Sequence, residues 1–430
     1  MNKNNRSHTV TSQRDPAVVV IPADRPAPLA VARRLGRRGI PVYGVDVSPD
    51  AICMASRYLI PHPLPYADRC AANRLETLLK LGKELGEAVL YPVSDDEVLL
   101  VSEHRKELGE YFRFVMPDHE TVTSMVTKDG LHRVSEQHHI PAPRSYPAGS
   151  LDAVEAVADR LPYPVILKPA FSPSWLRDEI AVLVKQNILS GMSKVVYCQD
   201  AKRLVEMYRK IAVFDPRMII EEVIPGSDDQ LVYFCFYLDR NSVPLATFAG
   251  IKVRVLPVGF GSATYVRSFY DEKLEQASLR LLEAVRYQGL GGVEFKRDSR
   301  DGQYKLIEFN ARLGMWDSYG VKCGVDIPYL SYCDALQRPV EPQRKYRSGV
   351  LWIDMQRDSR AFIILHRNKQ LGLWRWLRSL LGEKEWAFFS WDDWKPAWVS
   401  LKQVINRQGK RKKPNPVHPS GKTGSAETPH

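Results

Sequence analysis

The sequence predicts an α/β protein in which a parallel, doubly wound sheet is followed by a larger region built around antiparallel strands. Apolar strand-like segments alternate with helical stretches over the first 117 residues, which is typical of a parallel sheet. From residue 230 onward, strand-like segments follow one another closely, which favours antiparallel pairing. At 430 residues, the chain has room for two or three packed domains.

The composition is ordinary for a soluble globular protein, with 44% hydrophobic and 26% charged residues. No apolar run reaches the length that spans a membrane, and the first ten residues are polar, so neither a membrane helix nor a signal peptide is expected. The six cysteines contain no CxxC pair, which argues against a disulfide framework or a zinc site. These observations predict a cytoplasmic protein with reduced thiols.

The formal net charge of +11 is concentrated in part at the C-terminal end. From Arg407 onward there are six Lys or Arg and one acidic residue, among many Pro, Gly and Ser residues. Such a segment cannot bury a core, so residues 405–430 are expected to form a disordered basic tail. A solvated tail is favoured over one that contacts an anionic membrane, and no specific nucleic-acid partner is expected.

Residues 16–117 are predicted to form a domain with a Rossmann-like shape, after a disordered segment over residues 1–15. The first strand is followed by Pro22-Ala23-Asp24-Arg25-Pro26, which lacks the GxGxxG fingerprint of dinucleotide sites. The domain is therefore expected to share the shape of dinucleotide-binding folds without their ligand. Its predicted strands are 17–21, 40–45, 88–91 and 112–116, and its predicted helices are 28–38 and 95–108.

A second domain is predicted over residues 118–340. A helix that carries Lys128 ends before Pro141 and Pro143, and a buried strand over 164–169 contains Lys168 near its end. The predicted strands 292–296 and 304–310 are separated by a short polar turn, so a hairpin is expected there. Further helices are predicted at 151–160 and 201–211, and further strands at 218–222, 230–238, 245–253, 263–268, 292–296 and 304–310.

The predicted hairpin carries a set of side chains that could bind a metal ion. It brings Glu294 beside Glu308 and Asn310, and period-two alternation places Glu308, Asn310 and Arg312 on one face. Two carboxylates and an amide oxygen directed into a core are costly unless a cation pairs with them. Mg²⁺ that bridges nucleotide phosphates would fit these oxygen ligands. The alternative is an exposed strand face with ordinary salt bridges.

Two lysines and one acidic segment precede this hairpin. Lys128 and Lys168 are point charges suited to phosphate oxygens, although a single lysine at a strand end is more often a solvated rim residue. The segment 218–226 runs from an apolar strand into Glu221, Glu222 and a Pro-Gly turn, which would offer backbone groups to a flat base. Taken alone, this segment would be interpreted as a strand end followed by a solvated acidic turn.

These segments, in this order, resemble the ATP-grasp superfamily over about residues 118–337. The resemblance is strongest to the branch of carboxylate–amine ligases that contains D-aspartate ligase-like enzymes, and it implies a two-lobed domain that binds ATP with Mg²⁺ or, alternatively, Mn²⁺. The site residues that it implies are Lys128 and Lys168 for the ATP phosphates, Glu221, Glu222, Val223 and Ile224 for adenine, Asp228 or Asp229 for ribose, Glu294, Glu308 and Asn310 for the metal, Arg312 for the reacting groups, and Arg254 for phosphate or acyl-phosphate.

One departure from the family pattern concerns the lid over the phosphates. Members of the family usually carry a glycine-rich lid after the strand of the Lys168 type, whereas residues 170–195 contain the single glycine Gly191. Backbone N–H groups cradle phosphate where the chain turns tightly, which glycine eases. Either a reduced lid that includes Ser190 and Lys194 covers the phosphates, or the lysines make more of the phosphate contacts.

The predicted C-terminal extension over residues 341–404 is rich in tryptophan. Its stretch 371–382 places several Leu side chains and Trp374 on one helical face, with Arg375 and Arg378 elsewhere. Such a helix can lie on membrane headgroups or pack on the protein body with its arginines in water, and packing is favoured. Peripheral membrane contact through this helix and the basic tail is kept as an alternative, and so is a homodimer.

The function that the resemblance implies is an ATP-dependent ligation. A small carboxylate, such as that of an amino acid, would be joined to an amine through an acyl-phosphate. The expected partners are therefore small-molecule acids and amines. Two rival functions are phosphoryl transfer without amine ligation and a non-catalytic nucleotide-binding module that docks on a membrane.

Overall fold

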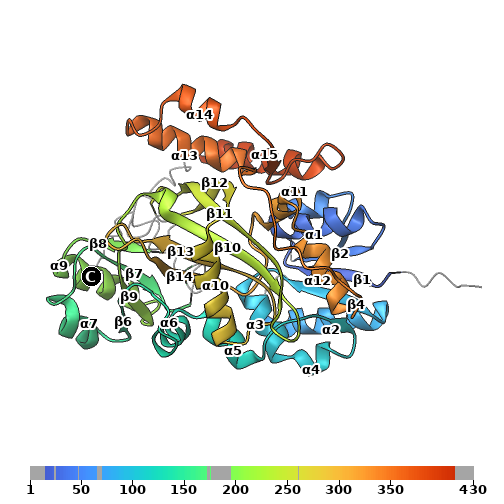
Figure 1. The fold of residues 1–430 in the computed structure, drawn as a ribbon, viewed down its shortest axis with the longest axis horizontal. Coiled ribbons are helices and arrows are strands. Elements are labelled where there is room, and N and C mark those ends of the chain that lie inside the picture. Colours follow the sequence, from blue (N-terminus) through green and yellow to red (C-terminus); the bar gives the residue numbers. More distant parts are fainter. Residues whose placement is uncertain are drawn as a thin grey trace, which may run out of the picture.

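The computed structural model describes residues 15–411 except 24–25, 47, 65–69, 172–174, 176–194 and 260, and it describes side chains as far as residue 405. Three sheets organise this part of the chain, with five, seven and four strands. In Figure 1, the N-terminal unit (blue) and the small four-stranded lobe (green) lie on opposite sides of the large sheet, and the C-terminal helices (orange to red) form a separate outer layer. The predicted fold class, an α/β chain with a Rossmann-like unit and a two-lobed domain, is confirmed.

The N-terminal unit is a parallel sheet with strand order β3-β2-β1-β4-β5. Its central strand β1 is almost completely buried, as expected for a parallel sheet that is covered on both faces. The edge strand β3 contains Pro61 and Pro63, which an edge position tolerates. The elements are β1 (Ala17–Ile21), α1 (Pro26–Gly36), β2 (Val42–Asp46), η1 (Ile52–Ala55), β3 (Ile60–Pro63), α2 (Ala71–Leu85), β4 (Ala88–Pro92), α3 (Asp95–Glu103), α4 (Arg105–Leu108) and β5 (Phe112–Arg113).

The small lobe is an antiparallel sheet with strand order β6-β9-β7-β8 and helices packed on it. Its core is formed by apolar side chains of the strands and of α7 and α9, including Leu167, Leu204 and Ile220. Two helices, α5 (His119–Val126) and α6 (Lys128–Gln137), lead into this lobe. Its other elements are β6 (Ser145–Ala148), α7 (Leu151–Ala158), β7 (Val165–Pro169), β8 (Val196–Cys198), α9 (Ala201–Ala212) and β9 (Met218–Glu222).

The seven-stranded sheet has the order β14-β13-β10-β11-β12-β15-β16, and its pairs are antiparallel except β15 with β16. Alternating side chains of β10 enter two different hydrophobic clusters, so this central strand is buried on both faces. The elements are η4 (Asp228–Gln230), β10 (Leu231–Leu238), β11 (Pro244–Leu256), β12 (Ser262–Phe269), α10 (Glu272–Ala284), β13 (Gly289–Arg297), β14 (Tyr304–Asn310), η5 (Asp317–Tyr319), α11 (Gly320–Cys323), α12 (Ile327–Ala335), β15 (Leu351–Ile353) and β16 (Lys384–Trp386).

Three further helices, α13 (Met355–Arg367), α14 (Leu373–Ser379) and α15 (Lys395–Arg411), form the outer C-terminal layer in Figure 1. The Arg357 side chain of α13 donates to carbonyl oxygens of Leu256, Ser262 and Ala263 at the turn between β11 and β12. This layer is therefore fastened to the large sheet. In the part of the chain that the structure describes, no helix combines the length and apolarity that a bilayer crossing requires.

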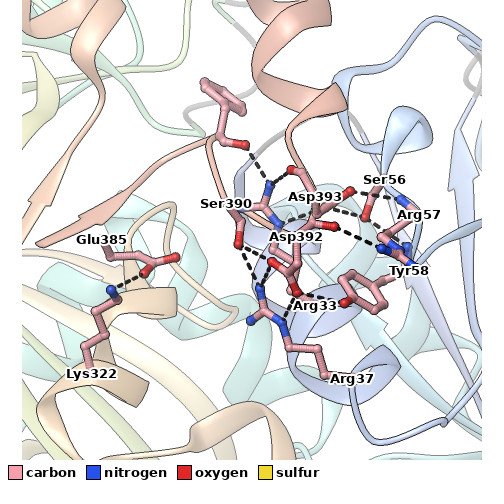
Figure 2. Close-up of polar contacts among 11 residues, drawn as sticks. Arg33, Arg37, Ser56, Arg57, Tyr58, Lys322, Glu385, Ser390, Asp392 and Asp393 are labelled. Carbon is pink, nitrogen blue, oxygen red and sulfur yellow. Dashed lines mark hydrogen bonds and ion pairs between the residues drawn. The ribbon is translucent and has the colours of Figure 1, made fainter.

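The C-terminal layer is also joined to the N-terminal unit by two charge pairs, of which Arg33–Asp393 is buried (Figure 2). Asp393 accepts from the Arg33 Nε atom at 2.9 Å and from the Ser56 hydroxyl at 2.7 Å, and both charged side chains are almost fully buried. The neighbouring Asp392 binds Arg37, whose guanidinium holds the pKa of that carboxyl far below its usual range. Removing either partner of the buried pair would leave an uncompensated charge, so these contacts fix how the two regions meet.

Candidate active site

A cleft lies between the small lobe and the large sheet, and the N-terminal unit reaches one end of it through Ala27 and Val93. The small lobe contributes side chains of β7 and β9, and the large sheet contributes those of β10, β11, β13 and β14. Cationic side chains outnumber acidic ones along its wall, which suits a polyanionic ligand. The charged lining residues are Lys128, Lys168, Glu221, Glu222, Lys252, Glu294, Lys296, Glu308 and Arg312.

The predicted hairpin is present, and its register brings the two carboxylates together. Glu294 of β13 pairs directly with Glu308 of β14, and Gly292 pairs with Asn310. Ile307 is an extra residue in β14 at this point, so the strand carries a β-bulge beside Glu308. All three oxygen-bearing side chains, Glu294, Glu308 and Asn310, line the cleft.

The donor set of the hairpin is compatible with a hard divalent cation. Carboxylate and amide oxygens are ligands that Mg²⁺ accepts alongside substrate phosphates. Within the described residues, no group of three His, Cys, Asp or Glu side chains is arranged to hold a metal ion, so the amide of Asn310 would have to supply the third protein ligand. The side chains of Glu294 and Glu308 are 16% and 25% exposed, so both are accessible from the cleft.

Three lysines pair with carboxylates across this cleft. The Lys128 Nζ atom lies 2.8 Å from Glu308 Oε1, Lys252 Nζ lies 2.5 Å from Glu294 Oε2, and Lys168 pairs with Glu221. Burial lowers the pKa of Lys128, but the nearby Glu308 outweighs that effect and the net pKa is raised. Burial dominates at Lys168, whose pKa is lowered. The two lysines therefore differ in how firmly they hold their protons.

The acidic end of β9 lines the other part of the cleft. Glu221, Glu222, Val223 and Ile224 all contact the cleft, together with the apolar Ile166, Leu231 and Ile307. The Glu222 carboxylate binds Arg300 at 2.6 Å, and its backbone N–H donates to the Arg144 carbonyl at 2.9 Å. These apolar side chains give the part of the cleft beside residues 221–224, here called the slot, a surface suited to a flat ring.

Arg312 lies at the end of the cleft that the N-terminal unit reaches. Its Nε atom is 2.8 Å from Asp95 Oδ1, at the start of α3. Ser94 caps this helix by accepting from the Glu97 N–H, which fixes the position of Asp95. Burial opposes the charge of Arg312, but Asp95 raises the pKa of the guanidinium above its ordinary value. A permanently charged guanidinium is therefore held at this end of the cleft.

A family model agrees with the geometry of this cleft. Residues 128–327 match the model of the carbamoyl-phosphate synthase L chain ATP-binding domain. The matched range begins at Lys128 and includes Lys168, residues 221–224 and the hairpin that carries Glu294 and Glu308. Residues 128–327 therefore resemble an ATP-grasp domain.

The proteins that are similar in sequence to this chain include ligases. It is 28% identical over 250 residues to the D-aspartate ligase of Enterococcus faecium, covering 56% of this chain and 58% of that protein. It is 23% identical over 234 residues to the carbamoyl phosphate synthase large chain of Methanobrevibacter smithii, covering 54% of this chain and 21% of that one. The matches thus span little more than half of the first relative and about a fifth of the second. They confirm the resemblance to ATP-grasp ligases that the sequence indicates.

Solved structures support the ATP-grasp fold independently. Biotin carboxylase from Campylobacter jejuni has a TM-score of 0.59 at 18% identity, covering 78% of this chain and 74% of that one. The L-amino acid ligase from Bacillus licheniformis has a TM-score of 0.56 at 18% identity, covering 77% and 76%. At these identities the likeness shows the fold alone.

The structure corrects the prediction for Arg254. This guanidinium does not line the cleft but is buried against Asp358 of α13, with Nε–Oδ1 and Nη2–Oδ2 distances of 2.7 and 2.9 Å. The reason is a bulge in β11, where the register with β12 shifts between Lys252 and Arg254. The extra residue, Val253, interrupts period-two alternation, so Lys252 lines the cleft and Arg254 lies under the C-terminal layer.

The ribose and lid predictions have different outcomes. Neither Asp228 nor Asp229 lines the cleft in the structure: Asp228 accepts from the Gly259 N–H at 3.2 Å, and Asp229 binds the Ser227 hydroxyl. Gly259 itself lines the cleft, so Asp228 lies one contact away from it. Ser190 and Lys194, the predicted reduced lid, fall outside the described residues.

Sequence reasoning missed three features of the cleft wall. Lys252 and Lys296 both line the cleft, and burial lowers the pKa of Lys296. The loop from Gly314 to Trp316 lines the end near Arg312. The two lysines could have been found from their positions in predicted strands. Lys252 lies two residues before Arg254, and Lys296 lies two residues after Glu294.

Proposed function

We propose that the protein is an ATP-dependent ligase that joins the carboxylate of a small acid, such as an amino acid, to an amine through an acyl-phosphate. The observation that carries this proposal is the direct pairing of Glu294 with Glu308 inside a cleft whose wall carries an excess of cations. The D-aspartate ligase and L-amino acid ligase among the similar proteins support a ligase in preference to other ATP-dependent activities.

The proposed roles divide the cleft into two ends. The slot beside Glu221–Ile224 would receive the adenine ring, and Lys128, Lys168 and Lys252 would face the phosphates. Glu294, Glu308 and Asn310 would hold Mg²⁺, which supplies charge neutralisation for the phosphates when it is bound. At the far end, Arg312 would hold the acid carboxylate or the acyl-phosphate, and Asp95 would act as a positioning residue for that guanidinium.

The proposed reaction has two covalent steps. An oxygen of the acid carboxylate attacks the γ-phosphorus, the bond between this phosphorus and the β,γ-bridging oxygen breaks, and ADP leaves with the electron pair. The amine nitrogen then attacks the acyl carbon, and the bond from this carbon to the phosphate oxygen breaks. Inorganic phosphate leaves, and the surplus amine proton passes to solvent or to the phosphate.

Charge placement in this chain would favour both steps. The lysine ammonium groups and Arg312 are positioned in the cleft wall by carboxylate partners before any ligand arrives, so cations are already in place where negative charge would develop. The buried loop around Trp316 would exclude water from the acyl-phosphate, because its indole is only 4% exposed. No protein nucleophile is required by this chemistry.

The experiment that tests this function is a screen for ADP release with amino acids offered in pairs, followed by mass detection of the joined product. A ligase releases ADP in proportion to a product whose mass is that of both substrates less one water. ADP release that never depends on an amine would instead support phosphoryl transfer. ATP binding without ADP release under every pair would contradict an enzymatic function.

A further inference from the structure

The short helix α14 presents an apolar stripe to solvent. Leu373 and Leu377 are four residues apart and Trp374 lies beside them, so these three side chains share one face of the helix. They are 47%, 40% and 82% exposed, and Leu381, just beyond the end of the helix, is 72% exposed. A surface helix normally packs its apolar stripe against the protein core. The stripe of α14 is instead exposed to solvent.

The stripe faces outward because the opposite face of α14 is already packed. The Trp376 ring stacks on Phe362 of α13, with centroids 4.5 Å apart, and its Nε1 donates to Asp358 at 2.8 Å. Asp358 in turn forms the buried pair with Arg254. A rotation of α14 that buried Trp374 would break these contacts.

The last helix, α15, carries a second exposed apolar stripe. Trp394 immediately precedes it, and Trp398, Leu401 and Ile405 follow at spacings of four, three and four residues. These four side chains are between 41% and 58% exposed, and the nearby Trp391 is 90% exposed. The other face is occupied, since Ser400 is buried and donates to Gln356. Both stripes thus belong to the outer layer that Figure 1 shows on one side of the molecule.

The charges around these stripes are almost all positive. The two exposed acidic side chains of residues 355–405 are both neutralised, Glu383 by Arg347 at 2.8 Å and Asp392 by Arg37 at 2.7 Å. The exposed basic side chains of the same segment are Arg360, Arg367, Lys369, Arg375, Arg378, Lys395 and Lys402. Tryptophan and leucine stripes bordered by basic residues are the pattern of helices that lie in an anionic lipid interface.

We propose that the outer face of α14 and α15 docks the protein on an anionic membrane surface. The apolar stripes would enter the boundary between headgroups and acyl chains, and the basic side chains would contact anionic headgroups. The net positive border favours this occupant over a second copy of the chain, because two copies would place like charges together at their interface. The proposal is independent of the proposed ligase chemistry.

Vesicle co-sedimentation of the full chain tests this proposal. Vesicles of phosphatidylcholine with about 30 mol% phosphatidylglycerol are compared with vesicles of phosphatidylcholine alone. We expect binding at least about tenfold tighter to the anionic vesicles and a blue shift of tryptophan emission on binding, since the exposed Trp374, Trp394 and Trp398 belong to the two stripes. Equal sedimentation with both kinds of vesicle, or with neither, would overturn the proposal.

Matched variants assign the binding to this face. Trp374→Ser with Leu377→Ser and Trp398→Ser is expected to weaken binding at least about tenfold. Val213→Ser with Phe214→Ser, which removes exposed apolar groups near the end of α9, is expected to leave it unchanged. Circular dichroism and thermal melting check that both variants are folded. If the triple variant bound vesicles as tightly as the wild type, the membrane contact would lie in another part of the chain, such as the basic tail. That result would overturn the proposal.

A second pair of variants tests the charge border. Arg375→Gln, Arg378→Gln, Lys395→Gln and Lys402→Gln together should abolish the preference for anionic vesicles. The control replaces four exposed basic residues of α9, namely Lys202, Arg203, Arg209 and Lys210, by Gln. Equal losses in the two variants would overturn the proposal. Sedimentation velocity without vesicles tests for a dimer. A dimer that forms in the wild type and is lost in the triple serine variant would also overturn the proposal, because this face would then join two copies of the chain.

Discussion

Glu294 and Glu308 lie directly opposite each other across the β13–β14 ladder, and each is bonded to a lysine from a different part of the chain. Lys252 comes from β11 and Lys128 from the first residue of α6. Like charges placed opposite each other destabilise a hairpin unless they are neutralised. The two lysines provide that neutralisation, and an arriving polyanion would offer them a second set of acceptors. This exchange of partners is the basis of the proposed nucleotide site.

Lys252→Met is expected to lower kcat/KM for ATP by about 100-fold, because it removes a buried cation that we propose faces the phosphates of ATP. Steady-state ADP release measures this loss. Lys305→Met is the matched control, since Lys305 pairs with Asp301 at the hairpin turn and does not line the cleft. Wild-type kinetics in the Lys252 variant would show that the bulge in β11 does not direct a functional lysine into the site.

Asp358→Ala is expected to lower the free energy of unfolding by about 3–5 kcal/mol, because it leaves the buried Arg254 guanidinium without its carboxylate. Urea unfolding measures this change. Arg254→Met with Asp358→Leu removes both charges and should recover most of the loss. If Asp358→Ala matched the wild type in stability, the assignment of Arg254 to a structural pair would be wrong.

Asp317 is expected to make stability depend on pH. Burial raises the pKa of this carboxyl to about 6, although the Gly314 N–H, the Cys235 thiol and Arg312 act in the opposite direction. The folded protein therefore binds more protons than the unfolded chain between about pH 4 and about pH 6, so stability falls as pH rises through this window.

Asp317→Asn removes this titration while keeping an oxygen that can accept from Gly314. The stability of the wild type relative to the variant should fall by about 2 kcal/mol from about pH 4 to about pH 7. Denaturant unfolding at several pH values measures it. Parallel stability curves for the two proteins would contradict the raised pKa.

Local sequence patterns were sufficient to predict the carboxylate hairpin and the acidic end of β9. A polar turn between two β-rich segments specifies a hairpin, and period two then specifies which side chains share a face. The position of Lys168 could be predicted because its strand is buried along its whole length. A fully buried strand has few alternative positions in the fold. In these places the local pattern and the tertiary structure agree.

The Arg254 prediction failed because its position depends on contacts that no local pattern records. The bulge at Val253 and the partner Asp358, 104 residues further along the chain, together decide which face the guanidinium takes. The edge strand β3 was missed because its two prolines argue against a strand. The predicted helix over 95–108 is divided at His104, whose backbone leaves helical geometry.

The most direct test of the proposed site is Mg²⁺-dependent ADP release by the double variant Glu308→Gln with Asn310→Ala. We expect release to fall by at least about 1000-fold with thermal melting unchanged, because two of the three proposed metal ligands are lost. Glu272→Gln with Gln276→Ala, an exposed hydrogen-bonded pair on α10, is the matched control and should retain activity. Wild-type ADP release from the Glu308/Asn310 variant would contradict the account.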